Sequence, residues 1–210
     1  MGFALKRGER YTVEDYLSWS DDGLRYELIE GVPFEMSAPG YEHQRVLGAL
    51  HVALALHLRE LAKAGGGEGG PPCDVLQSPL DVVLSDLTVV QPDLIVLCDP
   101  AKVKDGRIFG APDLVVEVLS PSSAAKDRKF KRRLYEAAGV PQYLLIDPAN
   151  RFVEVVSLNA EGRYGEPAVL DAGEGLTLCV APGFNLTLAQ LFGWPLPLEV
   201  RQELSGYIRG

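Results

Sequence analysis

Hydrophobic positions along the chain follow a helical period in some stretches and a strand period in others. The clearest helical stretch is 41–64, where apolar residues return every three to four positions on the face that carries His43. That face holds Val46, Leu47, Leu50, Ala53, Leu54, Leu58 and Leu61. The glycine- and proline-rich segment 65–72 ends this pattern and predicts a loop inside one domain.

Two short elements are predicted ahead of the long helix. Thr12 is a favoured helix N-cap and opens a short helix over 12–19. The runs 25–29 and 32–36 are strand-like and flank the dipeptide Glu30-Gly31, a turn sequence typical of a β-hairpin. We therefore expect a helix and a hairpin near the N-terminus.

Four strand-like runs follow the glycine-rich segment. The second and third are apolar on both faces, which is typical of strands that are covered on both sides. A predicted helix, Ser123 to Ala138, joins the third and fourth runs and indicates a right-handed crossover with parallel pairing. A further run, 152–158, is expected to pair antiparallel. The four runs are Val75 to Leu84, Val89 to Cys98, Asp113 to Leu119 and Gln142 to Ile146.

Length and composition limit the class of protein. The 210 residues predict one domain, with a helix and hairpin at 10–36, a core at 41–158 and a C-terminal extension at 159–210. No apolar run approaches the length of about 18 residues that a membrane helix needs, and the N-terminus lacks the apolar centre of a signal peptide. The three scattered cysteines argue against a disulfide framework or a cysteine zinc site and predict a reducing, cytoplasmic setting.

Two carboxylates interrupt the most apolar strands. Asp93 shares its predicted face with Ile95 and Leu97, and Glu117 lies on an equally apolar strand. A buried carboxylate needs an ion pair, hydrogen bonds or a metal. If the two strands are neighbours, the carboxylates can converge as oxygen ligands for a hard divalent cation. The alternative is a pair of strand-end acids that accept hydrogen bonds from loop amides.

The helix after the third strand carries a polar stripe. A helical wheel places Phe130, Leu134, Ala137 and Ala138 on the face that packs against the sheet. Asp127, Lys131 and Tyr135 lie on the border of that face, so Lys131 is well placed to reach the sheet. The alternative is that Asp127 and Lys131 form an ordinary surface pair.

The ordered set of motifs resembles a known family. The chain resembles the Uma-type family (Uma two) of restriction-endonuclease-like proteins, within the PD-(D/E)XK nuclease superfamily, over about residues 10 to 190. The matching pieces are Tyr26-Glu27-Leu28-Ile29-Glu30-Gly31, His43, Pro92-Asp93, Glu117-Val118-Leu119-Ser120-Pro121-Ser122, Asp127, Lys131, Tyr135 and Gly139-Val140-Pro141-Gln142-Tyr143. The resemblance implies an α/β (α+β) fold, with a mixed central sheet flanked by helices and an N-terminal β-hairpin extension.

The resemblance also implies an activity and a site. The expected function is a divalent-metal-dependent DNA endonuclease that holds Mg²⁺ or Mn²⁺ with Asp93, Glu117 and the Val118 carbonyl. The superfamily lysine is absent, because Leu119 stands two residues after Glu117, and Lys131 is expected to replace it. Glu27 joins these residues if the hairpin closes over the site; otherwise it is a hairpin carboxylate that faces solvent.

Further residues are weaker candidates. His43, Asp127 and Tyr135 are secondary site residues, although a lone histidine on an apolar helix face is more often structural. A basic cluster stands out against the net charge of −9 and is a candidate for DNA-backbone contacts, or else a solvated helix face. The cluster consists of Lys126, Arg128, Lys129, Arg132 and Arg133.

Three functional hypotheses remain open from the sequence. The first is the endonuclease, for which cleavage of both DNA strands by one site per chain favours a homodimer. The second is a non-catalytic nucleic-acid-binding or interaction protein on a nuclease scaffold. The third is a hydrolase for a small phosphate substrate, which would need a closed pocket. A nucleotide-driven motor is disfavoured, because no phosphate-binding loop motif follows a strand.

Overall fold

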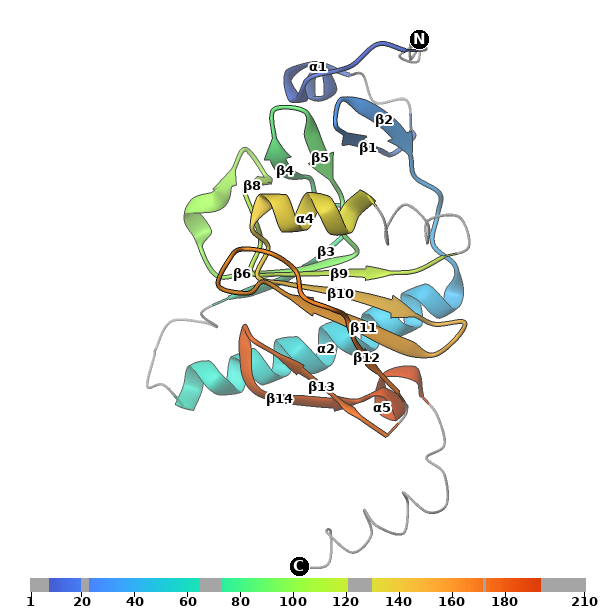
Figure 1. Cartoon of the computed structure of the whole chain (residues 1–210), viewed down its shortest axis with the longest axis vertical. Helices are drawn as coiled ribbons and strands as arrows, with labels where there is room; N and C mark the ends of the chain where they lie inside the picture. The colour runs from blue at the N-terminus through green and yellow to red at the C-terminus, as the bar shows by residue number, and fades with distance from the viewer. Residues whose placement is uncertain (1–7, 20–22, 65–72, 121–129, 172, 194–210) are drawn as a thin grey trace, which may run out of the picture.

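A six-stranded mixed sheet, called the core sheet below, lies at the centre of the computed structural model (Figure 1). The structure describes residues 8–19, 23–64, 73–120, 130–171 and 173–193. In spatial order the strands of the core sheet are β12 (Ala168–Leu170), β11 (Phe152–Ser157), β10 (Gln142–Asp147), β9 (Leu114–Val118), β6 (Leu94–Leu97) and β3 (Asp74–Gln77). The mixed sheet with helices on its faces confirms the predicted fold class.

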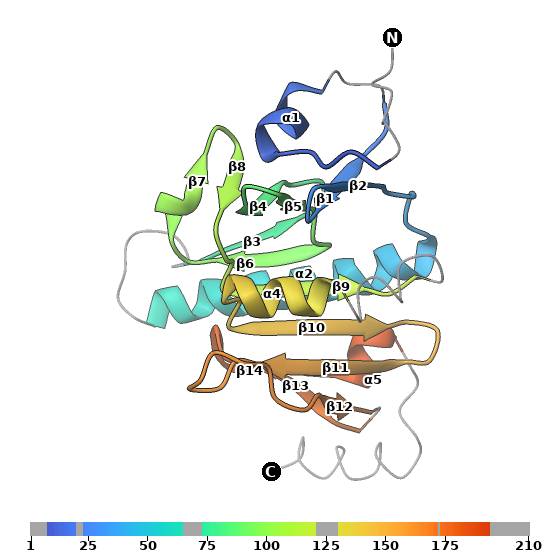
Figure 2. The ribbon, with the colours of Figure 1, turned by 45° about the horizontal axis from the view of Figure 1, so that its top comes forward.

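A second six-stranded sheet, called the N-terminal sheet, packs over one face of the core sheet (Figure 2). In spatial order its strands are β2 (Val32–Glu35), β1 (Tyr26–Ile29), β5 (Thr88–Val90), β4 (Val82–Ser85), β8 (Arg107–Phe109) and β7 (Val103–Lys104). The helix α1 (Val13–Ser18) closes its upper side, and a 3₁₀ turn, η1 (Pro100–Lys102), precedes β7. Residues from the start and the middle of the chain thus form one sheet.

Two of the predicted strands are each divided between the two sheets. The run from Val75 to Leu84 becomes β3 in the core sheet and β4 in the N-terminal sheet. The run from Val89 to Cys98 becomes β5 and then β6. Pro79 and Pro92 lie between the two halves, and proline has no N–H group to continue a ladder. The prediction of two continuous strands was therefore wrong.

The long helix α2 (Tyr41–Ala64) covers the opposite face of the core sheet. Its buried residues are Val46, Leu47, Leu50, Leu54 and Leu58, which confirms the predicted inward face. A two-stranded sheet of β13 (Gly175–Leu178) and β14 (Ala181–Thr187), together with α5 (Leu188–Phe192), packs beside α2 in the same hydrophobic core. Among the helices described, none is both long and apolar enough to cross a membrane.

Local signals for turns and caps are confirmed. The Thr12 side chain accepts a hydrogen bond from the Asp15 N–H group and forms a capping box at the start of α1. Glu30 and Gly31 have φ angles of 49° and 79°, as the two-residue turn between β1 and β2 requires. The strands β9 and β10 pair parallel and β11 joins β10 antiparallel, as the crossover and the following turn predict.

The helix α4 (Arg132–Ala138) has a different buried face from the predicted one. Phe130 is 51% exposed, whereas the side chains of Lys131 and Tyr135 are buried. The helical wheel ranks side chains by hydropathy and therefore placed Phe130 inward. The polar groups of Lys131 and Tyr135 lie inward instead because the buried carboxylate of Glu117 is their partner. The described part begins at Phe130, so the predicted start at Ser123 lies outside it.

The structure contains a disulfide bond that the sequence did not predict. Cys73 and Cys98 are joined at one end of the β3–β6 pair, and Cys179 is free and exposed. The expectation of no disulfide rested on the wide spacing of the cysteines in the sequence. Antiparallel pairing of Asp74 with Leu97 brings the two neighbouring cysteines face to face.

Candidate active site

An ion pair network without solvent exposure lies between the two sheets and α4. The Lys131 Nζ atom is 2.7 Å from Glu27 Oε1 and 2.7 Å from Glu117 Oε1. The Tyr135 hydroxyl donates a hydrogen bond of 2.6 Å to the same Glu117 oxygen. Glu27 and Tyr135 are 0% exposed, Lys131 is 2% and Glu117 is 3%. We call these four residues the buried charge cluster.

Three separate elements bring the buried charge cluster together. Glu27 comes from β1 of the N-terminal sheet, and Glu117 comes from β9 of the core sheet. Lys131 and Tyr135 are four residues apart at the start of α4 and therefore lie on the same side of the helix. The Gln91 N–H group donates a 3.1 Å hydrogen bond to Glu27. The predicted closure of the hairpin over the site is consistent with this burial of Glu27.

The cluster brings charged and polar groups together in a buried place. Lys131 joins the carboxylates of Glu27 and Glu117, and Tyr135 contacts Glu117. Burial raises the pKa of the Tyr135 phenol well above its usual range, and the negative charge of Glu117 raises it further. The phenol therefore stays protonated and donates to Glu117.

Replacing Tyr135 with phenylalanine is expected to change the alkaline stability of the chain. Above about pH 10 an unfolded tyrosine releases its proton, while Tyr135 keeps it in the folded state. The unfolded state then holds fewer protons, so the free energy of unfolding falls as pH rises. In Tyr135→Phe, the free energy of unfolding should fall less steeply with pH, and the difference in slope should correspond to about one proton. Urea denaturation between about pH 9 and 11 measures the slope.

The control for this measurement is Tyr41→Phe, because Tyr41 is 76% exposed. This substitution should leave the alkaline slope as it is in the wild type. An unchanged slope in Tyr135→Phe as well would contradict a buried, protonated phenol.

Asp93 lies on the strand next to Glu117. In the antiparallel pairing of β6 with β9, Leu94 is opposite Val116, and continuing this register by one residue places Asp93 opposite Glu117. The Val118 N–H group donates a 2.7 Å hydrogen bond to Asp93 Oδ2, and His43 Nε2 lies 3.0 Å from the same oxygen. The two acidic strands are neighbours, which is the condition that the sequence analysis set for convergence of the carboxylates, although the carboxylates have separate partners.

His43 connects the start of α2 to this carboxylate. Its side chain is 11% exposed, and its Nδ1 atom is buried without a hydrogen-bond partner among the described residues. An Nε2–H group that donates to Asp93 fixes the orientation of the imidazole ring. His43 is therefore more than a core residue of the apolar face, and it contacts one of the two strand carboxylates.

The donor set near the strands fits a divalent cation that keeps part of its water shell. No group of three or more His, Cys, Asp or Glu side chains suited to a metal occurs in the described ranges. Mg²⁺, however, is commonly bound by one or two carboxylates plus waters and substrate phosphates. Asp93 Oδ1 has no hydrogen bond to a described residue. The Val118 carbonyl leaves β9 on the same side as its N–H group, toward Asp93.

The structure describes two members of the predicted basic cluster, Arg132 and Arg133. Arg132 donates to the Gly165 carbonyl, and Arg133 is exposed on α4. The structure therefore does not bring these two arginines into the buried charge cluster. Lys126, Asp127, Arg128 and Lys129 lie outside the described residues.

Sequence reasoning missed Gln91. Its backbone N–H group holds Glu27, and its side chain is hydrogen-bonded to Arg25 and Asp81. A glutamine directly before Pro92-Asp93, within an apolar run, is a signal that could have identified it, because a buried amide needs partners.

Comparisons with known proteins agree with the fold and the motifs. A solved structure of "a putative nuclease belonging to DUF820" from Anabaena variabilis has a TM-score of 0.69 at 20% identity, covering 87% of this chain and 98% of that one. The Synechocystis sp. protein slr1290, described as uncharacterized, is 30% identical over 158 residues, which are 74% of this chain and 78% of that protein. The model of the Uma2 family, described as "Putative restriction endonuclease", matches residues 13–189. The chain therefore belongs to the Uma2 family.

Proposed function

We propose that the chain is a divalent-metal-dependent endonuclease that hydrolyses phosphodiester bonds in DNA. The observation that carries the proposal is the buried charge cluster, in which Lys131 bridges Glu27 and Glu117 on two different sheets. Asp93 lies opposite Glu117 on the next strand. Such an acid–lysine arrangement in a member of a restriction endonuclease family supports phosphodiester hydrolysis.

Asp93, Glu117 and the Val118 carbonyl would hold Mg²⁺ or Mn²⁺. A bound ion of this kind lowers the pKa of a bound water molecule and polarises the phosphate. Asp93 is oriented for this task by the Val118 N–H group and by His43. Glu117 is oriented by the Tyr135 hydroxyl and by Lys131, which both contact its Oε1 atom.

Lys131 would take the place of the superfamily lysine. Its ammonium group already lies 2.7 Å from Glu117, although Leu119 occupies the usual position of the lysine. In a site with little water, a fixed ammonium stabilises negative charge that develops on the phosphate. Glu27 holds Lys131 in place from the other sheet. We assign Glu27 as a positioning residue.

DNA is the proposed substrate, and a homodimer is the proposed assembly. The described residues of one chain form one buried charge cluster, so cleavage of both strands of a duplex is simplest for two chains related by a two-fold axis. The basic residues of α4 and of the segment before it are proposed to contact the DNA backbone. Arg133 is the exposed member of this set among the described residues.

Calorimetric titration with MnCl₂ and MgCl₂ tests the metal site directly. Wild type should bind at least one ion, while Asp93→Ala and Glu117→Ala should each abolish binding. Nicking of a supercoiled plasmid should then require Mg²⁺ or Mn²⁺ and stop with EDTA. The absence of metal binding by correctly folded wild type at millimolar concentration would overturn the proposal.

A second function is favoured by one observation. Glu117 and Lys131 are 3% and 2% exposed, so substrate cannot reach them without a change in the surrounding side chains. A nucleic-acid-binding protein that does not cleave would have no need for such access. Retention of DNA binding by wild type, with no cleavage in either metal, would favour this alternative.

A further inference from the structure

A polar cavity, open to solvent, lies at the edge of the N-terminal sheet, outside the buried charge cluster. Its volume is about 280 Å³, and part of its wall is the turn of the β7–β8 hairpin, at the outer edge of that sheet (Figure 2). The cavity is lined by Pro79, Leu80, Asp81, Gln91, Asp105 and Arg107. Gln91 also contacts the buried charge cluster, through its backbone N–H group.

One wall of the cavity is fixed by a hydrogen-bond network. Gln91 Oε1 accepts hydrogen bonds from Arg25 Nε and Nη2 at 3.0 and 2.8 Å. Gln91 Nε2 donates to Asp81 Oδ1 at 2.9 Å, and the Tyr16 hydroxyl donates to the same oxygen at 2.9 Å. Satisfied networks of this kind are rigid. The wall is therefore formed before any ligand arrives.

The lining residues of the β7–β8 turn have polar groups without a hydrogen bond to the described residues. Arg107 Nε donates to Asp81 Oδ2, and Arg107 Nη1 donates to the Asp105 carbonyl, each at 3.3 Å. Within the described ranges, the Arg107 Nη2 atom and the Asp105 carboxylate make no hydrogen bond or ion pair. The cavity thus presents free donors next to a free acceptor.

This combination selects the kind of ligand. The Arg107 guanidinium disfavours a cation, and the carboxylates of Asp81 and Asp105 disfavour a phosphate. The volume of about 280 Å³ is slightly below the range of about 300–1,000 Å³ for drug-sized ligands. A neutral, flat ring system with both donors and acceptors on its edge fits these limits. Nucleobases are such rings.

We propose that this cavity binds a single unpaired guanine base. Guanine has two adjacent acceptors, O6 and N7, for the Arg107 guanidinium, and two adjacent donors, N1–H and N2–H, for the Asp105 carboxylate. The other bases offer a carboxylate fewer adjacent donors. A base held here belongs to a strand at the active site, an assignment that rests on the proposed nuclease function.

The cavity is connected to the site by two short links. The Gln91 N–H group holds Glu27, and the Ser78 N–H group, next to Pro79, donates to the Asp93 carbonyl at 3.2 Å. A strand whose phosphate lies at Asp93 therefore has a base-binding cavity within a few residues of that carboxylate. The expected substrate has guanine at an unpaired position.

Titration of the full chain with the four deoxynucleoside 5′-monophosphates, without metal, tests the proposal by NMR. The guanine nucleotide should bind with a Kd of about 1 mM and about tenfold more tightly than the others. Asp105→Asn should weaken guanine binding about tenfold, since it removes the negative charge and replaces one of the two oxygens that would accept from N1–H and N2–H by an NH₂ donor. Asparagine tolerates the positive φ of 50° at this position, so the turn is kept.

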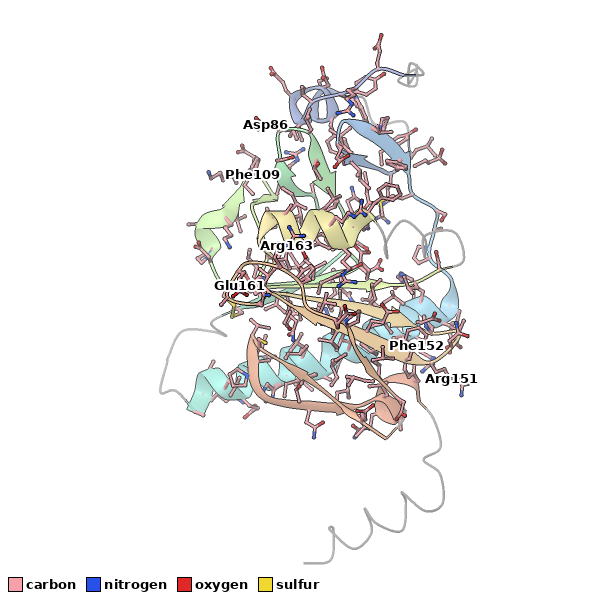
Figure 3. All side chains as sticks on the ribbon, in the orientation of Figure 1. Asp86, Phe109, Arg151, Phe152, Glu161 and Arg163 are labelled. Atoms are coloured by element: carbon pink, nitrogen blue, oxygen red, sulfur yellow. A yellow bond between two sulfur atoms is a disulfide. The ribbon has the colours of Figure 1, made fainter. Side chains whose placement is uncertain are left out.

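The matched control is Asp86→Asn. Asp86 is exposed at the turn between β4 and β5, beside α1 (Figure 3), and it does not line the cavity. This variant should bind the guanine nucleotide as wild type does. No binding by wild type, equal binding of all four nucleotides, or equal binding of 2-deoxyribose 5-phosphate would each overturn the guanine assignment.

Each of the two proposals can be overturned without the other. A chain that binds the guanine nucleotide selectively but nicks no plasmid retains the cavity assignment and loses the nuclease function. A chain that nicks plasmid in a metal-dependent way without any preference among nucleotides retains the nuclease and loses the guanine cavity.

Discussion

Lys131→Met is expected to destabilise the folded chain by about 3–5 kcal/mol. Methionine fills a similar volume but leaves the carboxylates of Glu27 and Glu117 buried without their shared cation. Removing one member of a buried ion network costs far more than the network contributes, because the remaining charges lose their compensation. Urea denaturation followed by circular dichroism measures the change in the free energy of unfolding.

Two further variants make this test specific. Arg133→Met removes an exposed positive charge from the same helix and should change stability by less than about 0.5 kcal/mol. Adding Glu27→Gln to Lys131→Met should restore part of the stability, because it removes one uncompensated charge. A Lys131→Met variant as stable as Arg133→Met would be incompatible with the buried charge cluster.

Glu117→Gln is expected to lower plasmid cleavage by about 10²–10³-fold. Glutamine keeps an oxygen that can accept hydrogen bonds from Lys131 and Tyr135, so the substitution removes charge more than shape. It also removes the anionic oxygen that is proposed to hold the divalent ion. The initial nicking rate in Mg²⁺, at matched protein concentration, gives the effect.

The control residue for this prediction is a glutamate on a nearby strand of the core sheet, level with Glu117 across the strands. Glu154 on β11 is opposite Leu145, which is itself opposite Glu117, and its side chain is half-buried. Glu154→Gln should cleave at the wild-type rate. A Glu117→Gln variant that cleaves normally would exclude Glu117 from the reaction.

Local signals in the sequence predicted most of the helices and strands, because their causes lie within a few residues. The cap at Thr12, the turn at Glu30-Gly31 and the apolar face of α2 depend on neighbours in the chain. The prediction of continuous strands was wrong at Pro79 and Pro92. Whether a proline ends a strand or leads it into another sheet depends on tertiary packing, which hydropathy along the chain does not contain.

In the candidate site, too, local signals were predictive, whereas contacts between distant parts of the chain were not. The sequence pointed to Glu117 because a charge in an apolar strand needs compensation, and to Lys131 because the helical wheel places it on the border of the buried face. It could not show that Lys131 lies fully inside, with Phe130 outside, because this depends on Glu27 arriving from another sheet. Gln91 was missed for the same reason, since its partner Glu27 is 64 residues away in the chain.

The mixed origin of the N-terminal sheet determines how the chain can be shortened. β1 pairs with β5, so the first hairpin completes a sheet whose inner strands come from the middle of the chain. Truncation past residue 36 would expose the edge of β5 and remove Glu27 from Lys131. The shortest continuous fragment with all four cluster residues runs from Glu27 to Tyr135. Deletions from the N-terminus would therefore abolish the site while β9, β10 and α2 were still present.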